Sequence, residues 1–306
     1  MKKLNITWSG ITDTTGYLFS FAKSLSCAVK NSPYAELSED IIASSGFAFR
    51  MWVNAESLCP SATSIWEFKK QKPWVENGGL ICDYVERLWG QDDIEEEHRL
   101  QAIDLIKKSI DKGIPVVSWD ISGCEWGLVT GYDDEARKLA TLKIQGNEDE
   151  ISYDVLGKMD LPILSVLAIT GRTEKSSDEI VADTKKLAAK HLKGSEWCEN
   201  PLGLAAYPAL IGYIKDKFTP DVSWNLEYYL GTYAALKYYA WKFFEKYGEA
   251  ELCELYQKIH KAWQSAFEIK KTKDAADDAV KSEIVNLLSE AYESEKTACD
   301  LMEKGV

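Results

Sequence analysis

Three short apolar segments lie between Gly113 and Leu142, and they constrain the fold more than any other part of the chain. They read IPVVSW, WGLVT and KLATL, and they are separated by Gly123 and by the turn that runs from Gly131 to Asp134. β-Branched and aromatic residues favour strands, whereas Gly and Asp favour tight turns. Because connections this short join neighbouring strands in antiparallel order, the region predicts a three-stranded antiparallel meander.

Helical patterns and further strands surround this meander in the first half of the chain. Leu18, Phe21 and Leu25 recur at helical spacing, and Asp13 or a neighbouring threonine can cap their helix. A second helix ends at Gly113. The predicted helices cover residues 17–30 and 100–111, and the predicted strands outside the meander cover 47–53, 151–156 and 163–169.

The second half of the chain shows only helical patterns. Residues 171–175 form a polar linker, after which Ser176 and Glu179 have the spacing of a helix-capping box. The segment from Trp224 to Tyr247 is apolar on nearly all sides, which is typical of the central helix of a bundle. The sequence therefore predicts an α+β domain at 1–172 and an all-α helical bundle at 173–306.

Composition narrows the partners and the compartment. The net charge is −13 and no basic patch is present, so nucleic acid and anionic membranes are poor partners. The longest apolar run, at 161–170, is too short for a bilayer, and the first residues lack the apolar stretch of a signal peptide. Seven cysteines without a CxxC pair indicate reduced thiols. We expect a cytoplasmic protein.

The thiols and imidazoles give weak signals for catalysis. Cys59 lies in a predicted loop and is either an inert packed thiol or a nucleophile. The three histidines, His98, His191 and His260, lie outside the predicted strands, and no two of them have metal-ligand spacing. Nucleotide-binding glycine loops are also missing from the sequence. We therefore predict neither a metal site nor a cofactor.

A carboxylate stands where the second strand of the meander begins. Glu125 at this position, beside Trp126, is either an acid with a raised pKa, an anchor for a cationic ligand, or the partner of an exposed Arg or Lys. The tryptophans of this half either line a groove or pack in the core.

The first half resembles the family named for the N-terminal domain of butirosin biosynthesis protein H, within the papain-like superfamily of cysteine peptidases. The resemblance is carried by the segments TTGYLFSFAKSL, SSGFAFRMWVNAESLCPSA, KKSIDKGIPVVSWDISGCEWGLVTGYDDEARK and LPILSVLAITGR. The helical half, with GLAAYPALIGYI, is more loosely similar to the corresponding region of related proteins. The resemblance implies a papain-like fold, in which a helix packs against an antiparallel sheet.

The resemblance also implies three catalytic positions. Members that act on acyl groups are expected to carry a cysteine at the start of the first helix, a histidine at the start of the second meander strand, and an Asp or Asn soon after. Here these positions fall on Thr14 or Thr15, on Glu125, and near Gln145 or Gly146. Because a threonine without a base is a poor nucleophile, we expect the Cys–His mechanism to be lost.

The leading hypothesis is a catalytically degenerate protein that binds a small molecule or peptide in the groove that the family uses. One alternative is an acyl or amide transferase, or a hydrolase, that uses Cys59 or Glu125. Another is an interaction protein whose helical half forms a homodimer. The candidate lining residues of the groove are Thr14, Thr15, Arg50, Cys59, Glu125 and Trp126.

Overall fold

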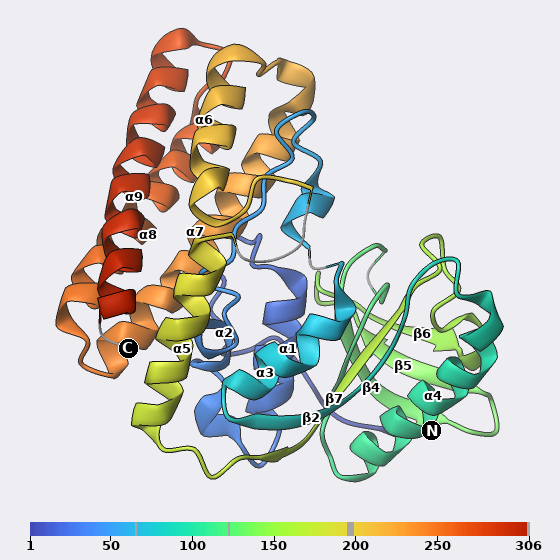
Figure 1. Ribbon diagram of the computed structural model, residues 1–306. Helices are drawn as coiled ribbons and strands as arrows, with labels where there is room; N and C mark the ends of the chain where they lie inside the picture. Colours follow the sequence, from blue (N-terminus) through green and yellow to red (C-terminus); the bar gives the residue numbers. More distant parts are fainter. Residues whose placement is uncertain (65, 122, 195–198, 305–306) are drawn as a thin grey trace. The chain divides into compact units, whose positions relative to one another are not determined.

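The computed structural model describes residues 1–64, 66–121, 123–194 and 199–304 (Figure 1). The chain forms two compact units, and each is built from three stretches of sequence. The sheet unit comprises 1–11, 20–41 and 67–175, and the helical unit comprises 12–19, 42–66 and 176–306. Two segments of the first half, 12–19 and 42–66, therefore pack with the helices of the second half.

The sheet unit contains a seven-stranded antiparallel sheet, so the α+β class is confirmed. The strand order is β2-β7-β3-β4-β5-β6, and β1 pairs with β4 beside β3. The predicted meander is present as β3, β4 and β5. The strands are β1 (Lys2–Lys3), β2 (Leu80–Arg87), β3 (Val116–Ser118), β4 (Gly127–Asp133), β5 (Lys138–Leu142), β6 (Glu148–Ser152) and β7 (Leu164–Arg172).

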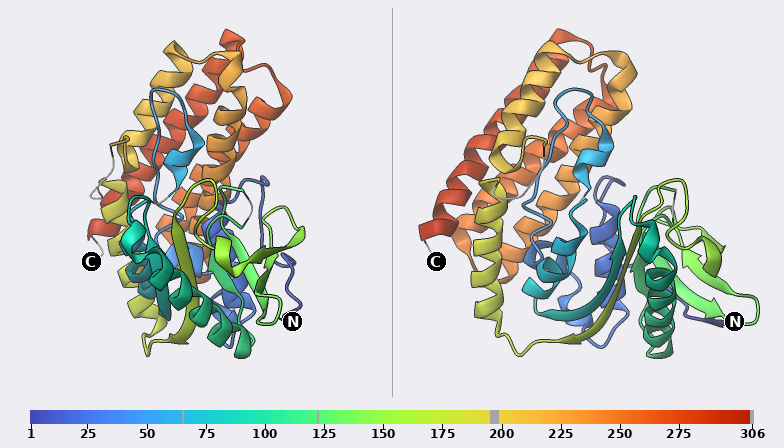
Figure 2. Two further views of the ribbon diagram at one scale, coloured as in Figure 1. Left: turned by 90° about the vertical axis from the view of Figure 1, so that its right-hand side faces the viewer. Right: turned by 45° about the vertical axis from the view of Figure 1, so that its right-hand side comes forward.

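The α-helices described ahead of the meander are α1 (Ser20–Lys30), α2 (Ile41–Ser44), α3 (Gln71–Asn77) and α4 (Glu95–Asp111). Figure 2 shows α4 beside the sheet, where its isoleucines share a core with Val129 of β4 and Val166 of β7. Gly113 ends α4 with a φ of +82°, a conformation that suits glycine. Helix α1 packs against β3 and β4. A helix-on-sheet arrangement therefore holds the meander in place.

The helical unit is built around α7, which packs against α8, and α8 packs against α9 (Figure 1). The predicted capping box is present, since the Ser176 Oγ accepts the Glu179 N–H and the Glu179 carboxylate accepts the Ser176 N–H. Within the described ranges, no helix is long and apolar enough to cross a membrane. The helices are α5 (Ser177–Leu192), α6 (Ala206–Asp216), α7 (Ser223–Lys246), α8 (Ala250–Thr272) and α9 (Asp278–Lys304).

Two tyrosines one helical turn apart on α7 bind the backbone of the 42–66 segment. The Tyr233 hydroxyl accepts the Trp52 N–H at 2.8 Å and donates to the Trp52 carbonyl. The Tyr229 hydroxyl accepts the Asn54 N–H at 3.0 Å and donates to the Cys59 carbonyl at 2.8 Å. These side chains supply the hydrogen bonds that a neighbouring strand would otherwise provide.

The strand predicted at 47–53 is therefore wrong. The structure has irregular backbone there, with one isolated bridge between Trp52 and Leu202. The apolar pattern correctly indicates burial, but a continuous apolar run does not reveal whether strands or side chains satisfy its backbone. Conversely, β2 is an element that the sequence analysis does not predict, because its charged residues interrupt the apolar pattern.

One turn further along α7, Lys237 is fully buried in a polar cluster. Its ammonium donates to Glu295 of α9 at 2.5 Å and to the Ala48 carbonyl at 3.2 Å. The other oxygen of Glu295 accepts the Tyr207 hydroxyl at 2.6 Å, and that hydroxyl accepts the Trp263 indole N–H at 2.9 Å. The cluster thus joins α6, α7, α8 and α9 to the 42–66 segment.

Replacing Lys237 by Met should destabilise the protein by about 3–5 kcal/mol, because the Glu295 carboxylate would stay buried without its counter-charge. Urea denaturation followed by far-UV circular dichroism measures this change. Lys258→Met is the matched control, since it breaks the exposed pair with Glu290 and should cost at most about 1 kcal/mol. Equal effects of the two substitutions would contradict the assigned role of Lys237.

Gly231 lies where α7 meets the 12–19 segment, and an alanine there should destabilise the protein by about 1–3 kcal/mol. A Cβ at this position would come within 2.7 Å of the Tyr17 ring and 2.9 Å of the Phe267 ring. Gly212 of α6 has open space around its Cα, so Gly212→Ala is the control and should stabilise by up to about 1 kcal/mol. Thermal denaturation of both variants measures the change in melting temperature. A higher melting temperature for Gly231→Ala would refute the close approach of the Tyr17 and Phe267 rings to this glycine.

Candidate functional site

Ser20, the first residue of α1, contacts Glu125 at the start of β4. The Ser20 hydroxyl donates a hydrogen bond to Glu125 Oε2, and the backbone N–H of Trp126 donates to the Ser20 oxygen at 3.3 Å. Ser20 is buried and Glu125 is half-buried. The structure therefore joins a hydroxyl at a helix N-terminus to a carboxylate at a strand start, and we call these two residues the Ser20–Glu125 pair.

Trp126 fixes this pair to the core of the sheet unit. Its side chain is completely buried, and its indole N–H donates to the Ser165 hydroxyl at 3.2 Å. Ser165 is also hydrogen-bonded to the Tyr84 hydroxyl at 2.8 Å. Aromatic rings surround the indole, with centroids 4.4 to 6.4 Å away, from Trp119, Phe21 and Phe68. Because Trp126 is held through both its backbone and its side chain, the neighbouring Glu125 has a defined position.

The prediction that Thr14 or Thr15 lies at the start of the first helix is wrong. Helix α1 begins at Ser20, and Asp13 does not cap it. Instead, the Asp13 carboxylate accepts two backbone N–H groups at 2.9 and 3.2 Å, which closes a turn ahead of the helix. Thr15 donates to the carbonyl of Gly231 in the helical unit. Ser20 is the functional candidate that the sequence analysis misses, and the turn signal at Asp13 is what indicates the later helix start.

The remaining candidates also have definite places. The buried Arg50 guanidinium lies over the Phe47 ring at 4.7 Å and the Trp52 ring at 4.9 Å. The half-buried Cys59 has its sulfur 3.0 Å from the Ser61 hydroxyl. These contacts give both residues packing roles within the helical unit.

The six candidate residues divide between the two units. Thr14, Thr15, Arg50 and Cys59 belong to the helical unit, and Glu125 and Trp126 belong to the sheet unit. The structure brings Glu125 and Trp126 together with Ser20. A common groove for all six stays a prediction.

Two histidines form hydrogen bonds with backbone carbonyls. His98 Nδ1 lies 2.7 Å from the Glu86 carbonyl, and His260 Nδ1 lies 3.1 Å from the Ala234 carbonyl. Burial lowers the pKa of His260. In the part of the chain that the structure describes, no group of three or more His, Cys, Asp or Glu residues is placed to hold a metal ion. These imidazoles therefore have structural partners.

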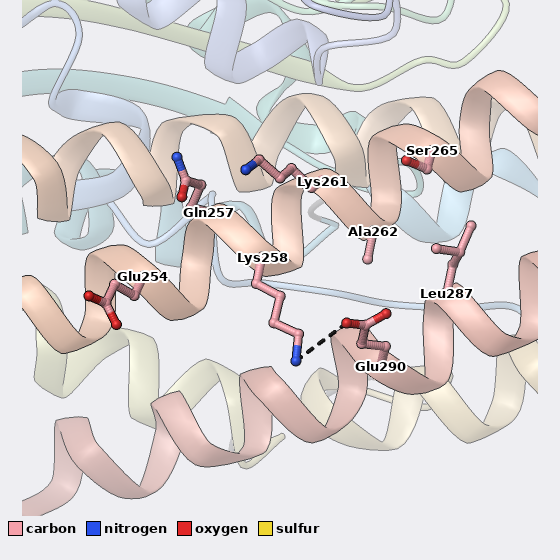
Figure 3. Close-up of a pocket in the computed structure, with 8 residues that line it drawn as sticks. All are labelled: Glu254, Gln257, Lys258, Lys261, Ala262, Ser265, Leu287 and Glu290. Carbon is pink, nitrogen blue, oxygen red and sulfur yellow. Dashed lines mark ion pairs between the residues drawn. The ribbon is translucent and has the colours of Figure 1, made fainter.

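A surface hollow of about 280 Å³ between α8 and α9 is a second candidate binding site (Figure 3). Across it, Lys258 and Glu290 form an ion pair of 3.3 Å, and both side chains are about half exposed. Because both charges are exposed, water and salt screen their attraction for a ligand, so this hollow is the poorer candidate. It is lined by Glu254, Gln257, Lys258, Lys261, Ala262, Ser265, Leu287 and Glu290.

No protein-family model and no curated protein matches the chain. A relation to the butirosin biosynthesis H family therefore stays a prediction, which rests on the sequence segments that resemble it. The Ser20–Glu125 pair is defined by its geometry and does not depend on that relation.

Brief alkylation at neutral pH should leave Cys27, Cys82 and Cys299 unmodified, because the thiolate is the reactive form. Burial raises the pKa of these thiols to about 11, about 12 and about 11. Peptide mass spectrometry reads the modification, with the exposed Cys124 as the accessible reference. Cys59 contacts a hydroxyl rather than a base, so it should react no faster than the free thiol of N-acetylcysteine, measured in parallel. Faster labelling of Cys59 would favour an enzyme that uses this thiol.

Proposed function

We propose that this chain is a papain-like protein without Cys–His chemistry that binds a small molecule or peptide at the Ser20–Glu125 pair. The observation that carries the proposal is the hydrogen bond between these residues, one at the N-terminus of α1 and the other at the start of β4. By resemblance, these are the places where acyl-transferring members are expected to carry their thiol and imidazole. The helix-on-sheet arrangement of α1 with β3 and β4 supports the same assignment.

The chemistry of the pair favours binding over catalysis. A glutamate has an ordinary pKa of about 4.3, against about 6.5 for histidine, so it is a weaker base towards a hydroxyl proton. The Ser20 oxygen also accepts a hydrogen bond from the Trp126 N–H, while the Ser20 hydroxyl donates its own hydrogen bond to Glu125. Since both groups already have partners in a rigid setting, they form a preorganised polar anchor.

A second candidate function is acyl transfer, with Ser20 as nucleophile and Glu125 as base. It is favoured by one observation, the direct hydrogen bond that an activated nucleophile requires. In such a reaction Glu125 would take the hydroxyl proton as the Ser20 oxygen bonds to the acyl carbon. The bond between that carbon and the leaving group would then break, and the leaving group would keep the electron pair and receive the proton. The product would be an acyl ester of Ser20.

Incubation with p-nitrophenyl acetate separates the two functions. We expect intact-mass and peptide mass spectrometry to show no acetyl group on Ser20, because the carboxylate activates the hydroxyl too weakly. The controls are Ser20→Ala and Ser26→Ala, the latter a buried serine of the same helix that donates to a backbone carbonyl. Acetylation that Ser20→Ala alone abolishes would establish acyl transfer instead.

Binding itself is tested by screening a fragment library with ligand-observed NMR. We expect hits that weaken about 10-fold in Glu125→Gln, as the loss of a hydrogen bond to a charged group predicts. Ser26→Ala should retain these hits. If every hit binds Glu125→Gln as tightly as it binds the unchanged protein, the proposed binding site is overturned.

A further inference from the structure

Two loops of the sheet unit lie next to each other where β2 ends and β7 begins. They are residues 88–94, which lead from β2 into α4, and residues 153–163, which lead into β7. Arg87, the last residue of β2, is paired with Leu164, the first residue of β7. The Arg87 guanidinium also donates to the carbonyl of Gly157 at 2.5 Å. This buried side chain therefore joins the two loops at their base.

The start of α4 adjoins the 153–163 loop through ion pairs. The Glu95 carboxylate lies 3.9 Å from the Lys158 ammonium. The Arg99 guanidinium lies 2.8 Å from Glu95 and 3.7 Å from Asp154, and Arg99 is buried. Both loops and the first turns of α4 thus form one surface, which belongs to a single unit of the chain.

Large apolar side chains are concentrated on this surface. Of those that are exposed in the described part of the chain, most belong to the two loops and to the first two turns of α4. Trp89 is the largest of them and is 55 % exposed. Neighbouring exposed apolar residues mark interaction sites, and tryptophan is enriched among the residues that dominate binding at protein interfaces. We call Trp89, Leu100, Val155, Met159 and Leu161 the Trp89 patch.

The segments that carry the Trp89 patch are strongly acidic. Residues 88–101 and 153–163 contain seven Asp and Glu side chains but only two cations, Arg99 and Lys158. Both cations already form ion pairs within the surface. The helix dipole favours the acidic residues in the first turn of α4, but it does not explain the two aspartates of the other loop. The patch therefore lies within an excess of negative charge.

This charge decides which kind of partner fits the patch. A symmetric contact with a second copy of the chain would set the same carboxylates against one another. Nucleic acid and anionic membranes are repelled for the same reason. The lysines at the N-terminus of the chain are held elsewhere, since Lys2 pairs with Asp111 and Lys3 pairs with Glu148. A foreign partner that combines apolar and cationic side chains matches the surface.

We infer that the Trp89 patch is a docking surface for a basic amphipathic segment of another protein. The apolar side chains of that segment would cover Trp89 and its neighbours, and its Lys and Arg side chains would pair with the carboxylates beside them. The inference goes beyond the proposed function, because it depends neither on the Ser20–Glu125 pair nor on its ligand.

Three synthetic peptides of about 15 residues test the chemistry of the partner. The first places Leu and Lys on opposite faces of a helix, the second has Glu in place of Lys, and the third has Ser in place of Leu. By fluorescence anisotropy we expect the Leu–Lys peptide to bind the full chain at least about 10-fold more tightly than either of the others. Equally tight binding of the Leu–Glu peptide would refute the basic partner, and that of the Ser–Lys peptide would refute the apolar contact.

Two pairs of variants locate the binding, which is necessary because the whole chain has a net charge of −13. Trp89→Ser should weaken the Leu–Lys peptide at least about 10-fold, whereas Trp224→Ser removes a tryptophan of the helical unit that is 56 % exposed and should have less than about a 2-fold effect. Asp160→Asn, which removes an exposed charge and no apolar packing, should weaken binding about 3-fold more than Asp216→Asn. Equal effects within both pairs would overturn the assigned surface.

Sedimentation velocity distinguishes a foreign partner from a second copy of the chain. We expect Trp89→Ser to leave the oligomeric state unchanged over a range of protein concentrations. A dimer that Trp89→Ser dissociates and Trp224→Ser does not would show that the patch is covered by a second copy, and the inferred basic partner would be wrong.

Discussion

The packing of the helical unit depends on a fully buried ion pair between Lys237 and Glu295. Removing a charge from water costs several kcal/mol, so the ion is stable only where Glu295 and the Ala48 carbonyl meet it. Burial lowers the pKa of Lys237, and the charge of Glu295 opposes that shift. Because few arrangements satisfy such a group, it specifies how α7, α9 and the 42–66 segment pack, more than it adds to stability.

The sheet unit also positions polar side chains through buried hydrogen bonds, and all but one of the groups involved are neutral. Hydrogen bonds run from Tyr84 through Ser165 and Trp126 to Ser20 and Glu125. The first three residues are core positions that hold the last two in place. Because these core residues hold both side chains, the Ser20–Glu125 pair has a defined geometry.

The Ser20–Glu125 pair joins a hydroxyl at the start of α1 to a carboxylate beside β4. It places a carboxylate acceptor in a fixed position at the start of β4.

The sequence by itself determined the meander, the α+β class, the end of α4 at Gly113 and the helical nature of the second half, because periodicity, capping residues and glycine are local signals. It also indicated Glu125 as the residue of interest. Only the tertiary structure decided that Ser20, rather than Thr14 or Thr15, meets Glu125, and that residues 47–53 pack on α7 without forming a strand. Both depend on side chains far away in sequence that satisfy buried polar groups, and no local pattern encodes those partners.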